Sequence, residues 1–206
     1  MAYPSPTPET DEYSELDTEE VFRAGVYRLL GSLLGGVPDD DGLLALATLT
    51  GDVTPLGQTV GRLAHLAGRT SPAAIAEEYQ TLFIGLGRGE VVPFASYYLT
   101  GFLQEKPLAR LRQDMEALGI ERDPDVSEPE DHVSSIFEMM AGLIDGTFGD
   151  PLSLSAQKAL YERHVASWAA YFFRDLEAAP SSVFYAAVAA VGATFIQIED
   201  EAFRMV

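Results

Sequence analysis

The stretch SEPEDH at residues 127–132 places four ionisable side chains within five positions. They are Glu128, Glu130, Asp131 and His132, and an apolar run that ends in two methionines follows them. Carboxylates and a histidine at this spacing suit metal binding, acid–base catalysis, capping of a helix, or pairing with a cationic partner. The other segments of the chain have to distinguish between these four tasks.

The same stretch follows the rules for the start of a helix. Ser127 and Glu130 have the spacing of a capping box, Pro129 suits the first turn, and early acids oppose the positive end of the helix dipole. We therefore predict a helix over residues 127–145. In that helix His132 would share a face with the apolar residues four, seven and eleven positions further on, so it would lie in or beside the core.

The sequence contains little that indicates catalysis or a metal site. Its three histidines, His65, His132 and His164, have neither HExxH nor paired metal-ligand spacing, and the chain has no cysteine and no GxSxG motif. The glycines of GLGRG at 85–89 follow a predicted helix and lack the P-loop lysine, so they indicate a tight loop. We predict no catalytic residue and no metal; a nucleotide-dependent enzyme using the loop at 85–90 is a remote alternative.

Composition limits the class of protein and its partners. A chain of 206 residues with 47% hydrophobic residues fits one packed domain. The formal net charge of −19, from 32 acids and 13 bases, disfavours nucleic acid and favours basic partners. The same acidity also fits solubility in a salt-rich cytoplasm. No secretory signal and no apolar run of about 20 residues occurs, so we predict a cytoplasmic protein without stable membrane insertion.

Helical periodicity extends through most of the chain. We predict a disordered acidic tail over 1–17, and then a first helix capped by Thr18. Ser71 before a proline indicates another helix start, and the Gly- and Pro-rich segment 85–95 is predicted as a loop.

Two long helices are predicted near the C-terminus. One would cover residues 153–179, and the other, over 181–203, is so apolar that we expect it to be central. No strand pair or internal repeat is apparent. The predicted fold is therefore all-α: a single-domain helical bundle of about eight to nine helices over residues 18–206.

Three segments in a fixed order carry a more specific signature. The first has the form aromatic-x-x-Leu-Phe followed by glycines, the second is PFASY at 93–97, and the third is EPEDH at 128–132. In this order they resemble the TorD/DmsD/NarJ family of redox-enzyme maturation chaperones, and more closely its TorD/DmsD-like branch. The resemblance covers the chain from about residue 20 to its end.

The resemblance implies a cytoplasmic, all-helical chaperone without catalytic activity. Such a chaperone binds the twin-arginine leader peptide and the apo form of a molybdenum-cofactor oxidoreductase of the dimethyl-sulfoxide-reductase type, and it delays export until the cofactor is inserted. The family further implies no cofactor beyond weak guanine-nucleotide binding, and a monomer or a domain-swapped dimer. A NarJ-like chaperone that docks on the apoenzyme of a nitrate reductase or formate dehydrogenase is the alternative within the family.

By the same resemblance, the leader-binding groove uses residues of all three segments. Two guanidiniums followed by an apolar stretch require carboxylates and apolar walls. We expect Asp131 to be the arginine partner, with Glu128 and Glu130 in support, and His132 to orient Asp131 or to change the groove charge as the pH falls. The predicted leader-binding residues are Tyr79, Leu82, Phe83, Pro93, Phe94, Ser96, Tyr97, Glu128, Glu130, Asp131 and His132.

Overall fold

The computed structural model describes residues 17–123 and 126–206, so the predicted tail lies outside the described residues apart from Asp17. Within these ranges the chain forms ten α-helices and one π-helical turn, and no strand. The predicted all-α fold is confirmed. The elements are α1 (Thr18–Gly35), α2 (Asp40–Ala47), α3 (Pro55–Ala67), α4 (Pro72–Tyr79), the π-helical turn (Gln80–Ile84), α5 (Ala95–Thr100), α6 (Lys106–Ala117), α7 (Val133–Asp145), α8 (Leu154–His164), α9 (Ala169–Ala178) and α10 (Phe184–Arg204).

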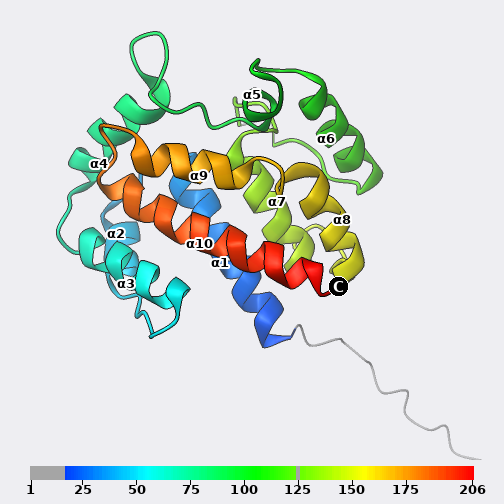
Figure 1. Ribbon diagram of the computed structural model, residues 1–206, viewed down its shortest axis with the longest axis horizontal. Coiled ribbons are helices and arrows are strands. Elements are labelled where there is room, and N and C mark those ends of the chain that lie inside the picture. Colours follow the sequence, from blue (N-terminus) through cyan, green and yellow to red (C-terminus); the bar gives the residue numbers. More distant parts are fainter. Residues whose placement is uncertain (1–16, 124–125) are drawn as a thin grey trace, which may run out of the picture.

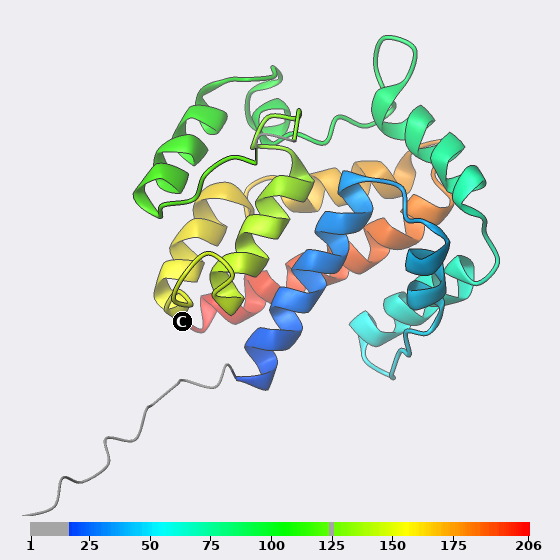
Figure 2. The same cartoon turned by 180° about the vertical axis from the view of Figure 1, so that it is seen from behind.

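The helices are arranged in two layers. Helices α1 and α7 lie side by side across one face of the molecule (Figure 2), and α9 and α10 lie together on the opposite face (Figure 1). At one end α3 packs on α10 and α2 packs on α3, whereas α5 and α6 form a helical pair at the other end. Helix α10 contacts α1, α3, α4 and α9, which confirms its predicted central position.

Aromatic side chains fill the space between the layers. Tyr27 of α1 meets Phe137 of α7 and Phe195 of α10 edge to face, with ring centroids 5.4 and 4.7 Å apart. Trp168 and Phe172, at the start of α9, are also fully buried. Because these rings come from four helices, the core fixes how α1 and α7 lie on α9 and α10.

The predicted helix over 153–179 is wrong, because the structure has two helices there. At Val165 the backbone leaves the helical region, with φ −123° and ψ −56°, and α9 starts only after Trp168. The indole Nε1 of Trp168 donates to the carbonyl of His164 at 2.6 Å, which satisfies a carbonyl at the end of α8. The apolar pattern continues through the break because both helices bury residues there, so periodicity alone could not locate it.

Of the two predicted N-caps Ser71 and Thr18, the first is confirmed and the second is wrong. Ser71 accepts a hydrogen bond from the backbone N–H of Ala74 at 3.3 Å, as predicted for an N-cap. Thr18 is not a cap: Asp17 caps α1 by accepting from the N–H of Glu19 at 3.4 Å, and Thr18 is the first helical residue. Both residue types are good N-caps, so the sequence did not decide between neighbours.

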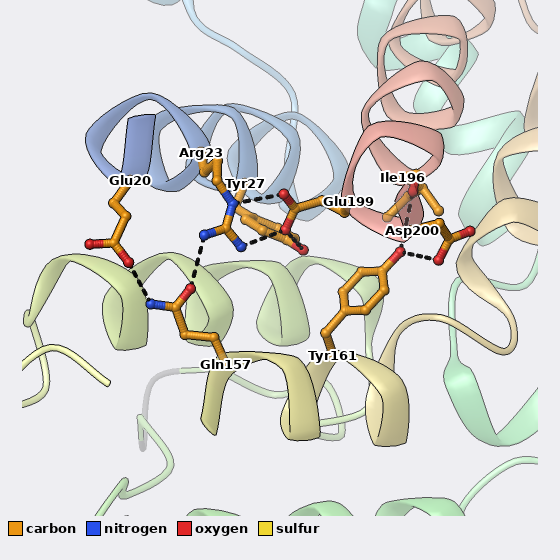
Figure 3. Close-up of polar contacts among 8 residues, drawn as sticks. All are labelled: Glu20, Arg23, Tyr27, Gln157, Tyr161, Ile196, Glu199 and Asp200. Carbon is orange, nitrogen blue, oxygen red and sulfur yellow. Dashed lines mark hydrogen bonds and ion pairs between the residues drawn. The ribbon is translucent and has the colours of Figure 1, made fainter. Parts of the chain in front are cut away.

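A buried polar network joins α1, α8 and α10 (Figure 3). Arg23 donates to both carboxylate oxygens of Glu199, at 2.7 and 2.9 Å, and Tyr27 donates to the same carboxylate at 2.9 Å. Gln157 accepts from Arg23 at 3.0 Å and donates to Glu20 at 2.9 Å. Burial and the neighbouring Glu199 raise the pKa of Tyr27 well above its ordinary value. The network therefore holds three helices by fully paired charges.

Candidate functional site

Two of the three signature segments pair with each other directly. Phe94 and His132 form an isolated antiparallel bridge, and their rings meet edge to face with centroids 5.1 Å apart. On either side, Ala95 N–H donates to the carbonyl of Asp131 and Val133 N–H donates to the carbonyl of Pro93, both at 2.9 Å. Segments that are 35 residues apart in the sequence thus become one wall.

The first signature segment is fixed against α10. The rings of Tyr79 and Phe83 lie 4.9 Å apart, and Phe83 meets Tyr185 of α10 edge to face at 5.3 Å. Nearby, the Glu78 carboxylate accepts from the N–H groups of Val183, Phe184 and Tyr185, which cap α10. The aromatic pair is therefore held by ring contacts and by an anchored helix end.

A cavity of about 580 Å³ lies where the three segments converge. The segments that line it gather around the C-terminal end of α1 and the N-terminal half of α7, beside the chain that links α6 to α7 (Figure 2). Its wall combines apolar side chains with carboxylates. The acidic lining residues are Glu121, Asp123, Glu128, Glu130 and Glu138, and the apolar ones include Tyr79, Phe83, Pro93, Phe94, Met115, Met139 and Phe148.

The cavity is acidic because its cations are few and already engaged. Among the described residues Arg122 is the one arginine in the lining, and it donates to the carbonyls of Val126 and Ser127 at 2.7 and 3.0 Å. Arg112, outside the lining, pairs with Glu130 at 2.7 Å, and these two hydrogen-bonded contacts lower the pKa of Glu130 despite partial burial. An arriving cation therefore meets a surplus of carboxylates.

Seven of the eleven predicted residues line this cavity. They are Tyr79, Phe83, Pro93, Phe94, Glu128, Glu130 and His132. Leu82 and Ser96 are fully buried outside the lining, and Tyr97 contacts the guanidinium of Arg88, whose Cζ lies 4.9 Å from the centre of its ring. The prediction that these residues bind a leader stays a prediction; the structure brings seven of them to one cavity and places the other four outside its lining.

Asp131 lies behind the wall. Its side chain is buried, with the residue 1% exposed, and its Oδ2 accepts from the backbone N–H of Ser96 at 2.9 Å, at the start of α5. It does not line the large cavity. The carboxylate therefore caps α5 and fixes the PFAS segment against the segment that precedes α7.

The capping box predicted from Ser127 and Glu130 is wrong. Helix α7 begins at Val133, six residues later than predicted. Ser127 donates its hydroxyl to Glu128 at 2.9 Å instead, and Glu130 turns to Arg112. Residues 129–132 form a turn closed by His132 N–H and the carbonyl of Pro129, and residues 131–133 pair with 93–95, so a tertiary contact overrides a local helix signal.

His132 is the N-cap of α7 and not a residue on its face, which corrects the predicted position. Its Nδ1 accepts from the backbone N–H of Ser134 at 3.2 Å, so the proton of the neutral ring is on Nε2. Burial lowers the pKa of His132 to about 4, although Glu128 and Asp131 act in the opposite direction. The ring is therefore neutral at physiological pH.

The sequence reasoning missed the α7 side of the cavity. Ser134, Ser135 and Glu138 line it, together with Met139 and the ring of Phe148. A signal was present: these three polar residues interrupt a helix that is otherwise apolar until Asp145. Polar positions one turn apart on a buried helix indicate a face that meets solvent or a ligand.

The glycine loop at 85–89 has a structural explanation. A Cβ at Gly85 would overlap the carbonyl group of Arg88, and one at Gly89 would overlap the backbone of Leu82 and Phe83. Val91 N–H then donates to the carbonyl of Leu82 at 2.9 Å. The glycines allow the loop to return closely against the π-helical turn, as the tight-loop prediction required.

In the ranges that the structure describes, no three His, Asp or Glu residues are grouped as metal ligands. No helix in those ranges combines the length and the apolar character needed to cross a membrane.

The sequence and the fold both match known proteins. The profile of the family described as "Nitrate reductase delta subunit" matches residues 50–174, more than half of the chain. A protein named "Chaperone protein TorD" from Vibrio cholerae is 26% identical over 193 residues, which cover 90% of this chain and 82% of the relative. Another protein of that name from Shewanella loihica is 27% identical and covers 87% and 92% of the two chains.

The fold also matches a crystal structure of a redox enzyme maturation protein from Archaeoglobus fulgidus. The TM-score is 0.58 with 24% identity, and the match covers 85% of this chain and 93% of the other. At this identity the match supports the fold.

The sequence matches define a class of redox-enzyme maturation proteins, and the fold match shows the all-helical architecture. The chain belongs to the TorD/NarJ family and is a redox-enzyme maturation chaperone of the TorD type rather than an enzyme.

Proposed function

We propose that this chaperone binds the twin-arginine leader of a molybdenum-cofactor oxidoreductase and delays export until the cofactor is inserted. One observation carries the proposal: the three signature segments converge on a single cavity with an aromatic wall and five carboxylates. A leader of this kind has two guanidiniums followed by an apolar stretch. Guanidinium forks pair with carboxylates, and apolar side chains bind against the aromatic wall.

The size of the cavity limits what it takes from the leader. A volume of about 580 Å³ lies within the roughly 300–1,000 Å³ of small-molecule sites, so it accommodates a few side chains and not a whole peptide. We infer that the arginine pair and the first apolar residues after it enter the cavity. Tyr79, Phe83 and Phe94 would contact the apolar part.

Asp131 takes a different role in this proposal from the one the sequence suggested. Its carboxylate accepts from Ser96 N–H inside the protein, so we propose that it positions the wall formed by Phe94 and His132 and does not itself contact an arginine. The carboxylates that line the cavity, Glu128 among them, are then the direct partners.

Calorimetric titration of the full chain tests the proposal. The titrants are a synthetic twin-arginine leader from a molybdoenzyme of the same genome and a control in which both arginines are replaced by lysine. We expect saturable binding of the first peptide and weaker binding of the control, because lysine lacks the bidentate fork. Absence of binding to the arginine peptide across a range of salt concentrations would refute the proposal.

A second candidate is docking on the mature apoenzyme, as in the NarJ-like branch. The description of the matched family, which refers to nitrate reductase, favours it. The titration distinguishes the two candidates when a leader without paired arginines is added. Equal binding of that leader and of the twin-arginine leader would favour the NarJ-like candidate.

A further inference from the structure

Glu138 presents a carboxylate to the cavity from α7. It projects from the second turn of α7, lines the cavity, and its side chain is 41% exposed. The cation near it is Arg28, whose Nε lies 4.0 Å away. Arg28 is bound more closely to another residue, because it donates to Asp145 Oδ2 at 2.7 Å. The Glu138 carboxylate is thus only weakly paired and faces the cavity.

Two glycines of α1 make room for this arrangement. A Cβ at Gly31 would lie 2.8 Å from Glu138 Oε1, and a Cβ at Gly35 would overlap the hydroxyl of Ser134. Gly31 and Gly35 are one turn apart on α1, as Ser134 and Glu138 are on α7, so the two helices approach closely along matching faces. Larger residues on α1 would displace the Glu138 side chain from its place in the cavity wall.

Two neighbouring arginines need two separate acceptors. In an extended peptide, adjacent side chains point to opposite sides. Glu128 is in the segment before α7, whereas Glu138 is five residues beyond the first residue of α7, which corresponds to about 7–8 Å along the helix axis. Glu130 is occupied by Arg112 through two hydrogen bonds. Glu128 and Glu138 therefore line the same cavity from two different parts of the chain, the segment before α7 and the second turn of α7.

We propose that Glu138 is a specificity-determining residue of the leader site: it binds one guanidinium of the arginine pair, and Glu128 binds the other. This inference rests on the proposed function. It adds that arginine recognition also depends on α7 and on Gly31 and Gly35 of α1, which lie outside the three signature segments.

The first test compares two substitutions that remove the same charge. Glu138→Gln removes the cavity carboxylate, and Glu162→Gln removes an exposed carboxylate on α8. We expect Glu138→Gln to weaken binding of the twin-arginine leader about five- to tenfold and Glu162→Gln to change it less than about twofold, because only the first loses a direct contact. Circular dichroism and a thermal melt confirm that both variants are folded.

Single-lysine leaders locate the contact. In the wild type we expect each Arg→Lys change in the pair to weaken binding. In Glu138→Gln, one of the two Arg→Lys changes should hardly alter the affinity, because the carboxylate that binds that arginine is already absent. Equal losses in wild type and variant for both peptides would show that Glu138 reads neither arginine.

A variant with the opposite effect guards against indirect damage. Arg28→Gln removes the cation beside Glu138, so we expect leader affinity to rise about two- to threefold. Arg62→Gln removes an exposed arginine on α3; it is the matched control and should raise leader affinity less.

Unchanged affinity in Glu138→Gln, while the wild type binds, would refute this inference alone. A wild type that binds no twin-arginine leader would refute the proposed function as well.

Discussion

Carboxylates serve opposite purposes in two regions of this molecule. In the buried network Glu199 is 0% exposed, and Arg23 and Tyr27 together donate to both of its oxygens (Figure 3). Five carboxylates line the cavity; Arg112 pairs with Glu130, Arg28 lies 4.0 Å from Glu138, and the one described arginine of the lining, Arg122, is bound to backbone carbonyls. The first arrangement fixes helices, whereas the second leaves negative charge for a ligand. The pairing of each carboxylate, and not the overall acidity of the chain, therefore distinguishes structure from function.

The largest effect should come from breaking the network at Glu199. Glu199→Ala leaves the guanidinium of Arg23 buried without its partner, so we expect a loss of about 3–5 kcal/mol in the free energy of unfolding. Urea denaturation measures it. Glu201→Ala, an exposed acid on the same helix, is the control and should change stability by less than about 0.5 kcal/mol.

A double replacement shows whether the loss comes from the unpaired charge. We expect Arg23→Met with Glu199→Leu to be clearly more stable than Glu199→Ala alone, because no buried charge is left without a partner. If Glu199→Ala cost less than about 1 kcal/mol, the network would not be the structural element described above.

The second-largest effect is a pH dependence of stability that arises from His132 in the cavity wall. Burial lowers the pKa of His132 to about 4, from 6.5 for the ordinary side chain. As the pH falls below 6.5, the histidine of the unfolded chain takes up a proton while the folded chain does not. The contribution of His132 to the free energy of unfolding is therefore full above pH 6.5 and is lost as the pH falls towards 4. Between pH 7 and pH 5 we expect His132 to account for a loss of about 2 kcal/mol.

Substitution isolates this contribution from the other titrating groups. Asparagine can replace the Nδ1 acceptor as an N-cap of α7 but does not titrate, so His132→Asn should show a smaller loss of stability between pH 7 and pH 5 than the wild type. His65→Asn, an exposed histidine on α3, should follow the wild type. Chemical denaturation at both pH values measures the difference; identical slopes in all three proteins would show that His132 titrates normally.

Local chemistry was enough to predict most of the fold. Ser71 at the start of α4, the loop after the π-helical turn and the apolar α10 follow from capping, glycine geometry and periodicity. The same rules failed where tertiary contacts decide. Ser127 and Glu130 fit a capping box, but the pairing of residues 93–95 with 131–133 moves the helix start to Val133. Short-range rules contain no information about a partner 36 to 40 residues away.

The sequence indicated many of the residues that line the cavity, but not which side chains face it. The signature residues Phe94 and His132 do meet at the cavity, yet the side chain of Asp131, the residue before His132, is buried behind the wall. Asp131 lies in the turn at 129–132, and the sequence does not state which way a side chain of that turn points. Glu138 was missed because the helix that carries it is apolar up to Asp145 apart from three polar residues.

The smallest expected effect is that of Glu138→Gln on stability. It gives the sharpest comparison, because the same substitution can be made at Glu199 of the buried network. Partial burial raises the pKa of Glu138, an effect that Arg28 opposes and Asp145 supports. A raised pKa of an acid means that its charge costs the folded state at neutral pH, so Glu138→Gln should leave the free energy of unfolding unchanged or increase it by up to about 0.5 kcal/mol. Urea denaturation at pH 7, beside Glu199→Gln, measures both.

Opposite signs at the two sites would separate stability from binding. We expect Glu199→Gln to destabilise, because it removes the negative charge that faces a buried guanidinium, while Glu138→Gln costs nothing in stability but weakens leader binding. That pair of results would assign the Glu199 carboxylate to the fold and the Glu138 carboxylate to binding. If Glu138→Gln instead destabilised the chain as much as Glu199→Gln, the cavity carboxylate would belong to the framework, and the division between the two regions would fail.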